Sequence, residues 1–189
     1  MLQGSSYQIQ AAYAQIQNHQ QGEEFWAICE ALRLYRCARH RGRWAKVWSA
    51  LTGHPRTLLD LDSVRGASTL RSCHHGGMRS VAVDRILGSE GRCHDFDAGF
   101  RPLRSHNKER WVRIAAARLM RTPLPPVTLT QVGDRYFVLD GHHRISVARA
   151  LGQTEVDAEV TVCKVAGPLP WEQAATARIP ALFRGAARI

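Results

Sequence analysis

The fold of this chain is decided by one stretch, Tyr136-Phe137-Val138-Leu139-Asp140-Gly141-His142-His143-Arg144-Ile145-Ser146-Val147-Ala148-Arg149-Ala150-Leu151-Gly152. Its apolar beginning predicts a buried strand that ends at Asp140, and Gly141 permits a sharp turn. Ile145, Ala148 and Leu151 then recur at helical spacing, and Gly152 stands where the C-cap of a helix is expected. The sequence therefore predicts a strand–turn–helix unit.

The start of this helix is a candidate anion site. The first backbone N–H groups of a helix have no intrahelical partner, and the positive end of the helix dipole lies beside them. His142, His143 and Arg144 add cationic donors at the same place. The competing interpretation is that the histidines cap and pack the helix start while Arg144 is solvated. The combination of strand, Asp-Gly turn, two histidines and arginine favours a phosphate site.

The segments around this unit predict a mixed α/β arrangement. Residues 127–132 alternate as a strand, a Gly133-Asp134 turn follows, and residues 136–139 form the returning strand of a hairpin. Trp111, Ile114, Ala115 and Leu119 predict a helix that Ser105 or Asn107 caps and Pro123 ends. Two more strands are expected, a short one that includes Val81, Val83 and Ile86 and a closing one at residues 156–162.

The N-terminal part of the chain predicts helix over residues 8–50, followed by a polar connector from Gly66 to Gly77. Arginines alternate with aromatic residues between Arg33 and Trp48. This segment is either a nucleic-acid contact or an amphipathic helix. Its helical spacing favours Trp44, Val47 and Trp48 packing on the α/β part, with the arginines facing water and available to DNA.

Composition limits the class of protein. The 189 residues include 26 Lys and Arg against 16 Asp and Glu, a formal charge of +10, which favours contact with nucleotides or phosphate-bearing polymers. No apolar run is long enough for a membrane helix, so no membrane partner is expected. The first residues lack the pattern of a secretory signal, so a cytoplasmic protein is expected. Five scattered cysteines in such a chain argue against a disulfide framework.

Two clusters carry zinc-type ligands, Cys73-His74-His75 and Cys93-His94. Neither has the Cys-X-X-Cys spacing of a zinc knuckle, so adventitious metal affinity is favoured over a structural zinc site. Magnesium that accompanies a nucleotide is the favoured metal, with Asp140 as the carboxylate nearest to the phosphates.

The decisive stretch resembles the ParB/sulfiredoxin superfamily, specifically its ParB N-terminal-like branch with an Asp-Gly-His-His-Arg turn. The resemblance covers about residues 80–163. It includes residues 83–92, Asp95-Phe96-Asp97, residues 100–103, Leu124-Pro125-Pro126-Val127, the hairpin and residues 156–161. It implies an α+β fold with a small mixed sheet over residues 80–165, a helical basic extension and connector over 1–79, and a C-terminal tail over 166–189.

The members of this superfamily differ in the residues at the turn, and each version of the turn implies a different function. Sulfiredoxins carry a catalytic cysteine where this chain has His142, so sulfinic acid reduction by that route is not expected. In chromosome-partitioning ParB the turn binds the triphosphate of CTP, and Gly141 and Arg144 match it. The free-serine kinases carry the same Asp-Gly-His-His-Arg turn and need a carboxylate base, for which Glu90, Asp95 and Asp97 are candidates.

The resemblance and the residues together give a leading function and two alternatives. The leading expectation is a ParB-like, DNA-associated protein that binds CTP or ATP, with magnesium, through Gly141, His142, His143, Arg144 and Ser146. A small-molecule kinase is the enzyme alternative, with Asp140, His142 and His143 as candidate catalytic residues. A non-catalytic interaction module is the third, and a homodimer is left open. Only 28 residues follow Thr161, too few for the helix-turn-helix module of full-length ParB.

Overall fold

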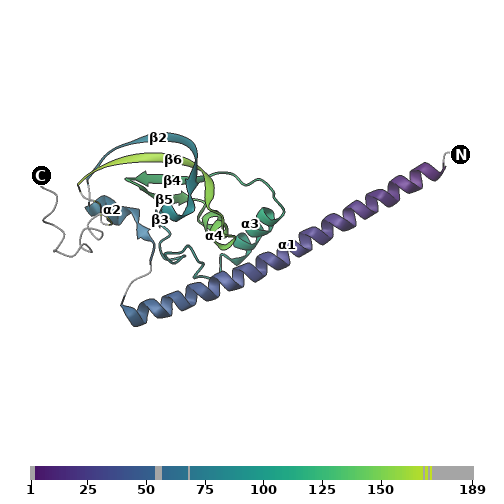
Figure 1. The fold of residues 1–189 in the computed structure, drawn as a ribbon, viewed down its shortest axis with the longest axis horizontal. Coiled ribbons are helices and arrows are strands. Elements are labelled where there is room, and N and C mark those ends of the chain that lie inside the picture. Colours follow the sequence, from purple (N-terminus) through teal and green to yellow (C-terminus); the bar gives the residue numbers. More distant parts are fainter. Residues whose placement is uncertain (1–2, 54–56, 68, 168, 170, 172–189) are drawn as a thin grey trace, which may run out of the picture.

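A computed structural model describes residues 3–53, 57–67, 69–167, 169 and 171 of the chain (Figure 1). The helices are α1 (Gln3–Thr52), α2 (Leu61–Ala67), α3 (Lys108–Leu119) and α4 (His142–Ala150), with a short 3-10 helix η1 (Val83–Arg85). The strands are β1 (Leu59–Asp60), β2 (Thr69–Ala82), β3 (Ile86–Ser89), β4 (Val127–Val132), β5 (Arg135–Asp140) and β6 (Glu155–Ala166).

The strands form one mixed sheet in the order β1-β3-β5-β4-β6-β2. β3 is parallel to β1 and β5, β4 is parallel to β6, and the β4–β5 and β6–β2 pairs are antiparallel. The sheet and its helices confirm the α+β prediction with a small mixed sheet and a helical N-terminal segment. The central position of β5 places the decisive turn at the end of a strand that has neighbours on both sides.

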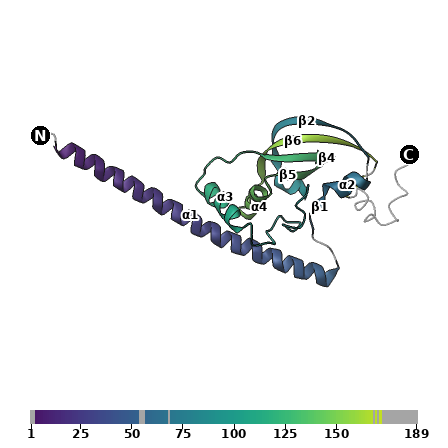
Figure 2. The same ribbon diagram turned by 180° about the vertical axis from the view of Figure 1, so that it is seen from behind.

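The helices α3 and α4 lie between the sheet and α1, whose N-terminal half projects well beyond the rest of the molecule (Figures 1 and 2). The core of the sheet includes Ile86, Leu129 and Val138, all fully buried. A second core joins α1 to α3, where the rings of Tyr35 and Trp111 are 5.4 Å apart between centroids. This packing holds α3, and hence the start of α4, in a fixed place.

Four sequence predictions at and near the decisive turn are confirmed. Residues 127–132 and 135–140 pair as a hairpin, and residues 142–150 form the helix that follows it. Gly152, just beyond the C-cap Leu151, has φ 70°, a left-handed conformation in which its N–H donates to the carbonyl of Arg149. The predicted α3 ends at Leu119, before Pro123, with Asn107 at its N-cap.

The prediction of a polar connector from Gly66 to Gly77 is wrong. Thr69–Ala82 is a 14-residue strand, and it pairs with β6 along most of its length. The stretch has no apolar alternation, since Cys73, His74 and His75 are exposed. Because β2 lies at the edge of the sheet, its pairing depends on backbone hydrogen bonds to β6 more than on buried side chains.

The argument against disulfides is wrong for one pair of cysteines. Cys73 of β2 and Cys163 of β6 are directly opposite each other and are joined by a disulfide. Their cross-strand position could not be read from the sequence, because it depends on β2 being a strand. Cys29, Cys37 and Cys93 are free.

The helix predicted over residues 8–50 is confirmed, but the packing predicted for its aromatic residues is wrong. Trp44, Val47 and Trp48 are exposed by 62, 50 and 61%, respectively, in this protomer. The face of α1 that contacts the rest of the chain instead carries small residues around Tyr35, namely Ala27, Ala31, Gly42 and Ala45. A small-residue face lets the helix backbone approach closely, which leaves the large side chains on the outside.

The described helices include none that is long and apolar enough to span a membrane. The proposed division into residues 1–79, 80–165 and 166–189 stays a prediction, although β1 and β2 show that residues before 80 contribute strands to the sheet. Most of the predicted C-terminal tail, from residue 172 onward, lies outside the described residues.

Candidate functional site

The turn between β5 and α4 requires its glycine. Gly141 is the N-cap of α4 and has φ 98°, a left-handed conformation that residues with a side chain rarely adopt. A Cβ atom at this position would lie 2.6 Å from Cγ1 of Val127, on the neighbouring strand β4. No side chain caps the helix. The backbone N–H groups of His142, His143 and Arg144 therefore begin the helix without intrahelical partners.

Arg144 is tied to the scaffold around the turn. Its guanidinium donates to the backbone carbonyls of Pro125 and Pro126, each at 2.6 Å, and to the carboxylate of Asp140 at 2.5 Å. The side chain is 14% exposed. These contacts do not fit the interpretation of Arg144 as a solvated residue, because its donors hold the Leu-Pro-Pro segment against the turn. The predicted contact of Arg144 with phosphates stays a prediction.

The two histidines are buried and neutral, which corrects the expectation that they are cations. His142 is 5% exposed and His143 is 3% exposed. Burial lowers the pKa of each from 6.5 to about 4, and the positive charges of Arg92 at His142 and of Arg110 at His143 act in the same direction. At neutral pH both rings therefore offer one N–H donor and one acceptor nitrogen.

Among the described residues, the ring of His142 has a hydrogen-bond partner and the ring of His143 does not. The Nε2 atom of His142 shares a hydrogen bond of 2.6 Å with the Oγ atom of Ser89, the last residue of β3. Both ring nitrogens of His143 are buried and lack a hydrogen-bond partner among the described residues. An unsatisfied buried polar group costs about 1–3 kcal/mol, so a hydrogen-bond partner for this ring would have to come from outside the described residues.

A small pocket opens at this helix start. It is lined by Arg92, Arg110, Ile114, Asp140, Gly141, His142, His143 and Arg144. Arg92 comes from the loop after β3, and Arg110 comes from the first turn of α3. Sequence reasoning missed both arginines, because each is far from the turn along the chain and only the fold brings them together. The pocket therefore combines three arginines, an uncapped helix start and an unpartnered histidine.

The structure places Ser146 apart from the other predicted site residues. Its Oγ atom accepts a hydrogen bond of 2.8 Å from Nε1–H of Trp111, and both side chains are buried. Ser146 lines a different cavity, between α4 and α1. The bond to Trp111 makes Ser146 a structural contact between α3 and α4, and its predicted ligand contact stays a prediction.

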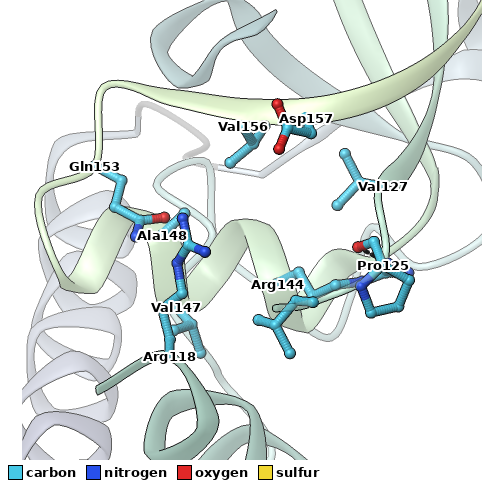
Figure 3. Close-up of a pocket in the computed structure, with 10 residues that line it drawn as sticks. Arg118, Pro125, Val127, Arg144, Val147, Ala148, Gln153, Val156 and Asp157 are labelled. Carbon is cyan, nitrogen blue, oxygen red and sulfur yellow. Dashed lines mark hydrogen bonds between the residues drawn. The ribbon is translucent and has the colours of Figure 1, made fainter. Parts of the chain in front are cut away.

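A second small pocket lies on the other side of Arg144 (Figure 3). Its walls come from α3, α4 and β6 and from the Leu-Pro-Pro segment that leads into β4. They carry the apolar side chains of Val127, Val147 and Val156 and the polar side chains of Arg118, Gln153 and Asp157. With the amide oxygen of Gln153 turned toward Arg118, it accepts a hydrogen bond of 2.7 Å from Nε of that arginine. Arg144 lines both pockets.

The three carboxylates proposed as a catalytic base occupy different environments. Glu90 forms an ion pair with Arg65, and the buried Asp97 accepts hydrogen bonds from the backbone N–H groups of Gly99 and Arg101. Asp95 faces Arg104 at 3.5 Å, and its charge acts on both His142 and His143. Of the three, Asp95 is therefore the one that acts electrostatically at the helix start.

The cysteines of the two candidate zinc clusters are separated in the structure. Cys73 is in the disulfide, and Cys93 is half-buried with its Sγ atom 3.5 Å from Oδ1 of Asp60. Burial raises the pKa of the Cys93 thiol to about 11, with the charge of Asp60 acting in the same direction. Within the described ranges no three His, Cys, Asp or Glu side chains are grouped as metal ligands would be.

Comparisons with known proteins identify no family. No family model and no curated protein matches the chain. Among solved structures, it is similar to the crystal structure of sulfiredoxin from Arabidopsis thaliana, with a TM-score of 0.34 and 13% identity over 44% of this chain and 82% of that one. The resemblance to the ParB N-terminal-like branch therefore stays a prediction from the turn and its neighbouring motifs.

Proposed function

We propose that the chain binds the phosphates of a nucleotide in the pocket at the start of α4. The observation that carries the proposal is His143, a buried neutral ring that has no hydrogen-bond partner among the described residues and lies in a pocket that Arg92 and Arg110 border. One ring N–H and the first N–H groups of α4 would donate to phosphate oxygens, since a helix start favours bound anions. The two exposed arginines would supply the balancing charge.

Because both histidines are neutral, the positive charge for a bound phosphate would come from the arginines. Arg92 raises the cost of protonating both rings and Arg110 that of protonating His143, so the histidines contribute directional hydrogen bonds while the arginines contribute charge. Arg144 contributes differently, because it fixes the turn through Asp140, Pro125 and Pro126. The second pocket, beyond Arg144, offers apolar walls and polar groups to the rest of the nucleotide.

Magnesium is compatible with this proposal but not required by it. Asp140 is the one carboxylate that lines the pocket among the described residues, and it is already paired with Arg144. A nucleotide-bound magnesium needs only one or two protein carboxylates. Asp140, more than half exposed, retains an oxygen for this purpose. Nucleotide binding measured with magnesium and with a chelator would show whether the metal contributes.

Calorimetric titration with ATP, CTP, GTP and inorganic triphosphate tests the proposal. We expect Arg110→Gln and Arg92→Gln each to lose about 1.5–3 kcal/mol of binding, roughly a 10- to 150-fold weaker affinity. The matched control is Arg113→Gln, an exposed arginine one turn further along α3 that does not line the pocket. If inorganic triphosphate binds as tightly as the nucleotides do, the pocket is a phosphate site but not a nucleotide site.

The proposal fails if wild-type protein binds none of these ligands at millimolar concentration. It also fails if Arg113→Gln weakens binding as much as Arg110→Gln does, because affinity would then come from net charge alone.

DNA association is the second part of the proposed function, and its observation is the basic surface of α1. Arg36, Arg41, Arg43 and Lys46 are all exposed on this helix. Phosphate contacts of this kind lose affinity steeply with salt, with a slope of about −0.9 per phosphate contacted. We expect charge reversal at Arg36 and Arg43 to weaken binding about equally for every DNA sequence. If DNA affinity is unchanged by the two charge reversals and by salt, α1 does not contact DNA.

A small-molecule kinase is the alternative that Asp95 favours. In this reaction the Asp95 carboxylate accepts the proton of a serine hydroxyl, whose oxygen attacks the terminal phosphorus of the nucleoside triphosphate while the nucleoside diphosphate leaves. Incubation with labelled ATP and free serine tests it, with Asp95→Asn as the inactive variant and Glu90→Gln as the control. No phosphoserine from wild-type protein that binds ATP would exclude this activity.

A further inference from the structure

In helix α1 the small side chains are buried and large apolar side chains are exposed, which is the reverse of an ordinary surface helix. A surface helix usually buries its large apolar side chains and exposes polar ones. In α1 the fully buried face carries Ala27 and Ala31, whereas Trp26 and Leu51 are 58 and 76% exposed. Large exposed apolar surfaces mark interaction sites. The described residues of the protomer therefore leave these large apolar side chains of α1 uncovered.

A regular seam runs along this face, and all of its residues except the half-buried Glu30 are exposed. Its positions are spaced alternately by four and three residues: Trp26, Glu30, Arg33, Cys37, His40, Trp44, Val47 and Leu51. This is the spacing of the contact positions in a coiled coil. Trp26 and Trp44, 18 residues apart, are separated by about five helical turns and so share one side of the helix. The seam is apolar at both ends and polar in the middle.

We propose that this seam binds the same seam of a second copy of the chain, with the two α1 helices antiparallel. The charges along the helix favour this occupant. Glu23, Glu24 and Glu30 lie in its earlier part, while the basic residues between Arg33 and Lys46 follow. An antiparallel pair sets the acidic segment of one copy against the basic segment of the other, whereas a parallel pair sets like charges together.

The antiparallel register is set by pairing the two tryptophans of the seam with each other. Residues whose numbers add to about 70 then face each other across the pair, in contact positions of a two-stranded coil. Trp26 of each copy faces Trp44 of the other, and Glu30 faces His40. Two such aromatic pairs bury the exposed rings, and the Glu30 carboxylate gains a partner besides Arg33, to which it is paired within the helix.

Sedimentation or light scattering of the full chain tests the proposal. We expect wild-type protein to be a dimer at micromolar concentration, and Trp44→Gln and Trp26→Gln to raise the dimer dissociation constant at least tenfold. Met78→Gln is the matched control, because Met78 is an equally exposed apolar side chain on β2. Circular dichroism checks that the variants fold, and folding is expected because both tryptophans are exposed in the protomer.

Cysteine cross-linking tests the direction of the helices. In a Cys29→Ser background, Arg33→Cys places a thiol opposite Cys37 of the other copy, so mild oxidation should give a covalent dimer. The same background without Arg33→Cys should stay uncross-linked at Cys37. Cross-linking through Cys37 alone would indicate parallel helices and overturn the antiparallel pairing.

Two other outcomes contradict the proposal. If the wild-type protein stays monomeric, the seam does not bind a second copy of the chain. Sedimentation with anionic lipid vesicles that depends on Trp44 and Trp26, without dimerisation, would assign the face to a lipid surface, which also binds helices rich in tryptophan and arginine. Nucleotide binding is measured separately at α4, so its failure would not affect either result.

Discussion

The Nε2 atom of His142 lies 2.6 Å from the Oγ atom of Ser89, which joins the first residue of α4 to the last residue of β3. The same Oγ atom accepts a hydrogen bond from the backbone N–H of Arg92. One hydroxyl thus links the helix start to the loop that carries a pocket arginine. The geometry of the candidate site therefore depends on a residue that does not line it.

Replacing Ser89 should destabilise the protein and weaken the site. Ser89→Ala leaves a buried nitrogen of His142 unpaired, which should cost about 1–3 kcal/mol of unfolding free energy. Ser80→Ala is the control, because its hydroxyl bonds to Glu155 at the surface and its loss should stay within roughly 0.5 kcal/mol. Urea unfolding of the two variants measures the difference. Equal stabilities would mean that water replaces the Ser89 hydroxyl.

Acid should destabilise the fold through the two histidines. The folded protein keeps the pKa of His142 and His143 at about 4, while the unfolded chain has values near 6.5. The unfolded state therefore binds more protons between these values, so the stabilisation is complete above pH 6.5 and is lost as the pH falls toward 4. Each histidine contributes a slope of up to about 1.4 kcal/mol per pH unit.

Urea unfolding between pH 7.5 and 4 measures this slope, and His143→Gln should reduce it. NMR titration of the imidazole protons gives the folded-state values directly. Midpoints near 6.5 for both rings would contradict their burial in the neutral form.

The sequence identified the local elements around the turn because their signals are local. The alternation over residues 127–132, the Gly133-Asp134 turn and the helical spacing after Gly141 each lie within a few residues. The same reasoning failed for β2, because Cys73, His74 and His75 form an edge strand whose pairing partner, β6, follows about ninety residues later. Pairing of that kind leaves no local pattern to detect.

Only part of the candidate site could be predicted from the sequence, again because some of its contacts join residues that are distant along the chain. Gly141 and the helix start could be predicted, whereas Arg92 and Arg110 join the pocket only through the packing of α3 on α4. The charge expected on His142 and His143 was wrong because burial sets their protonation, and burial is a property of the fold. The helical spacing of Trp44 predicts that it packs on the α/β part, but the small residues of α1 occupy that contact.

The conformation of Gly141 predicts a sharp contrast between two glycines. Gly141→Ala forces a side chain into φ 98° and against Val127, so we expect a loss of about 2–4 kcal/mol together with loss of nucleotide binding. Gly152→Ala also occupies a left-handed conformation, at φ 70°, but its Cβ would meet open space. We expect it to cost only about 1 kcal/mol. Thermal unfolding and calorimetry compare them, and equal losses would contradict the steric argument.

The disulfide predicts a redox-dependent stability. Cys73 and Cys163 are separated by 90 residues, so their cross-link restricts the unfolded chain strongly. Removing both with Cys73→Ala and Cys163→Ala should cost about 2–4 kcal/mol. Reductant should lower the melting temperature of wild-type protein and leave that of the double variant unchanged. Cys29→Ala, which removes an exposed free thiol, should keep the response to reductant.

Arg144 and Arg110 should separate the scaffold from the ligand contact. Arg144→Ala removes the donors to Pro125, Pro126 and Asp140, so we expect it to lower the melting temperature and weaken nucleotide binding together. Arg110→Ala removes an exposed side chain at the pocket, so binding should weaken while stability stays within roughly 0.5 kcal/mol. Arg144→Lys cannot reproduce three contacts with one ammonium group and should resemble Arg144→Ala. If Arg144→Ala instead unfolds like wild type and loses only affinity, its guanidinium contacts the ligand and the turn is held by the backbone alone.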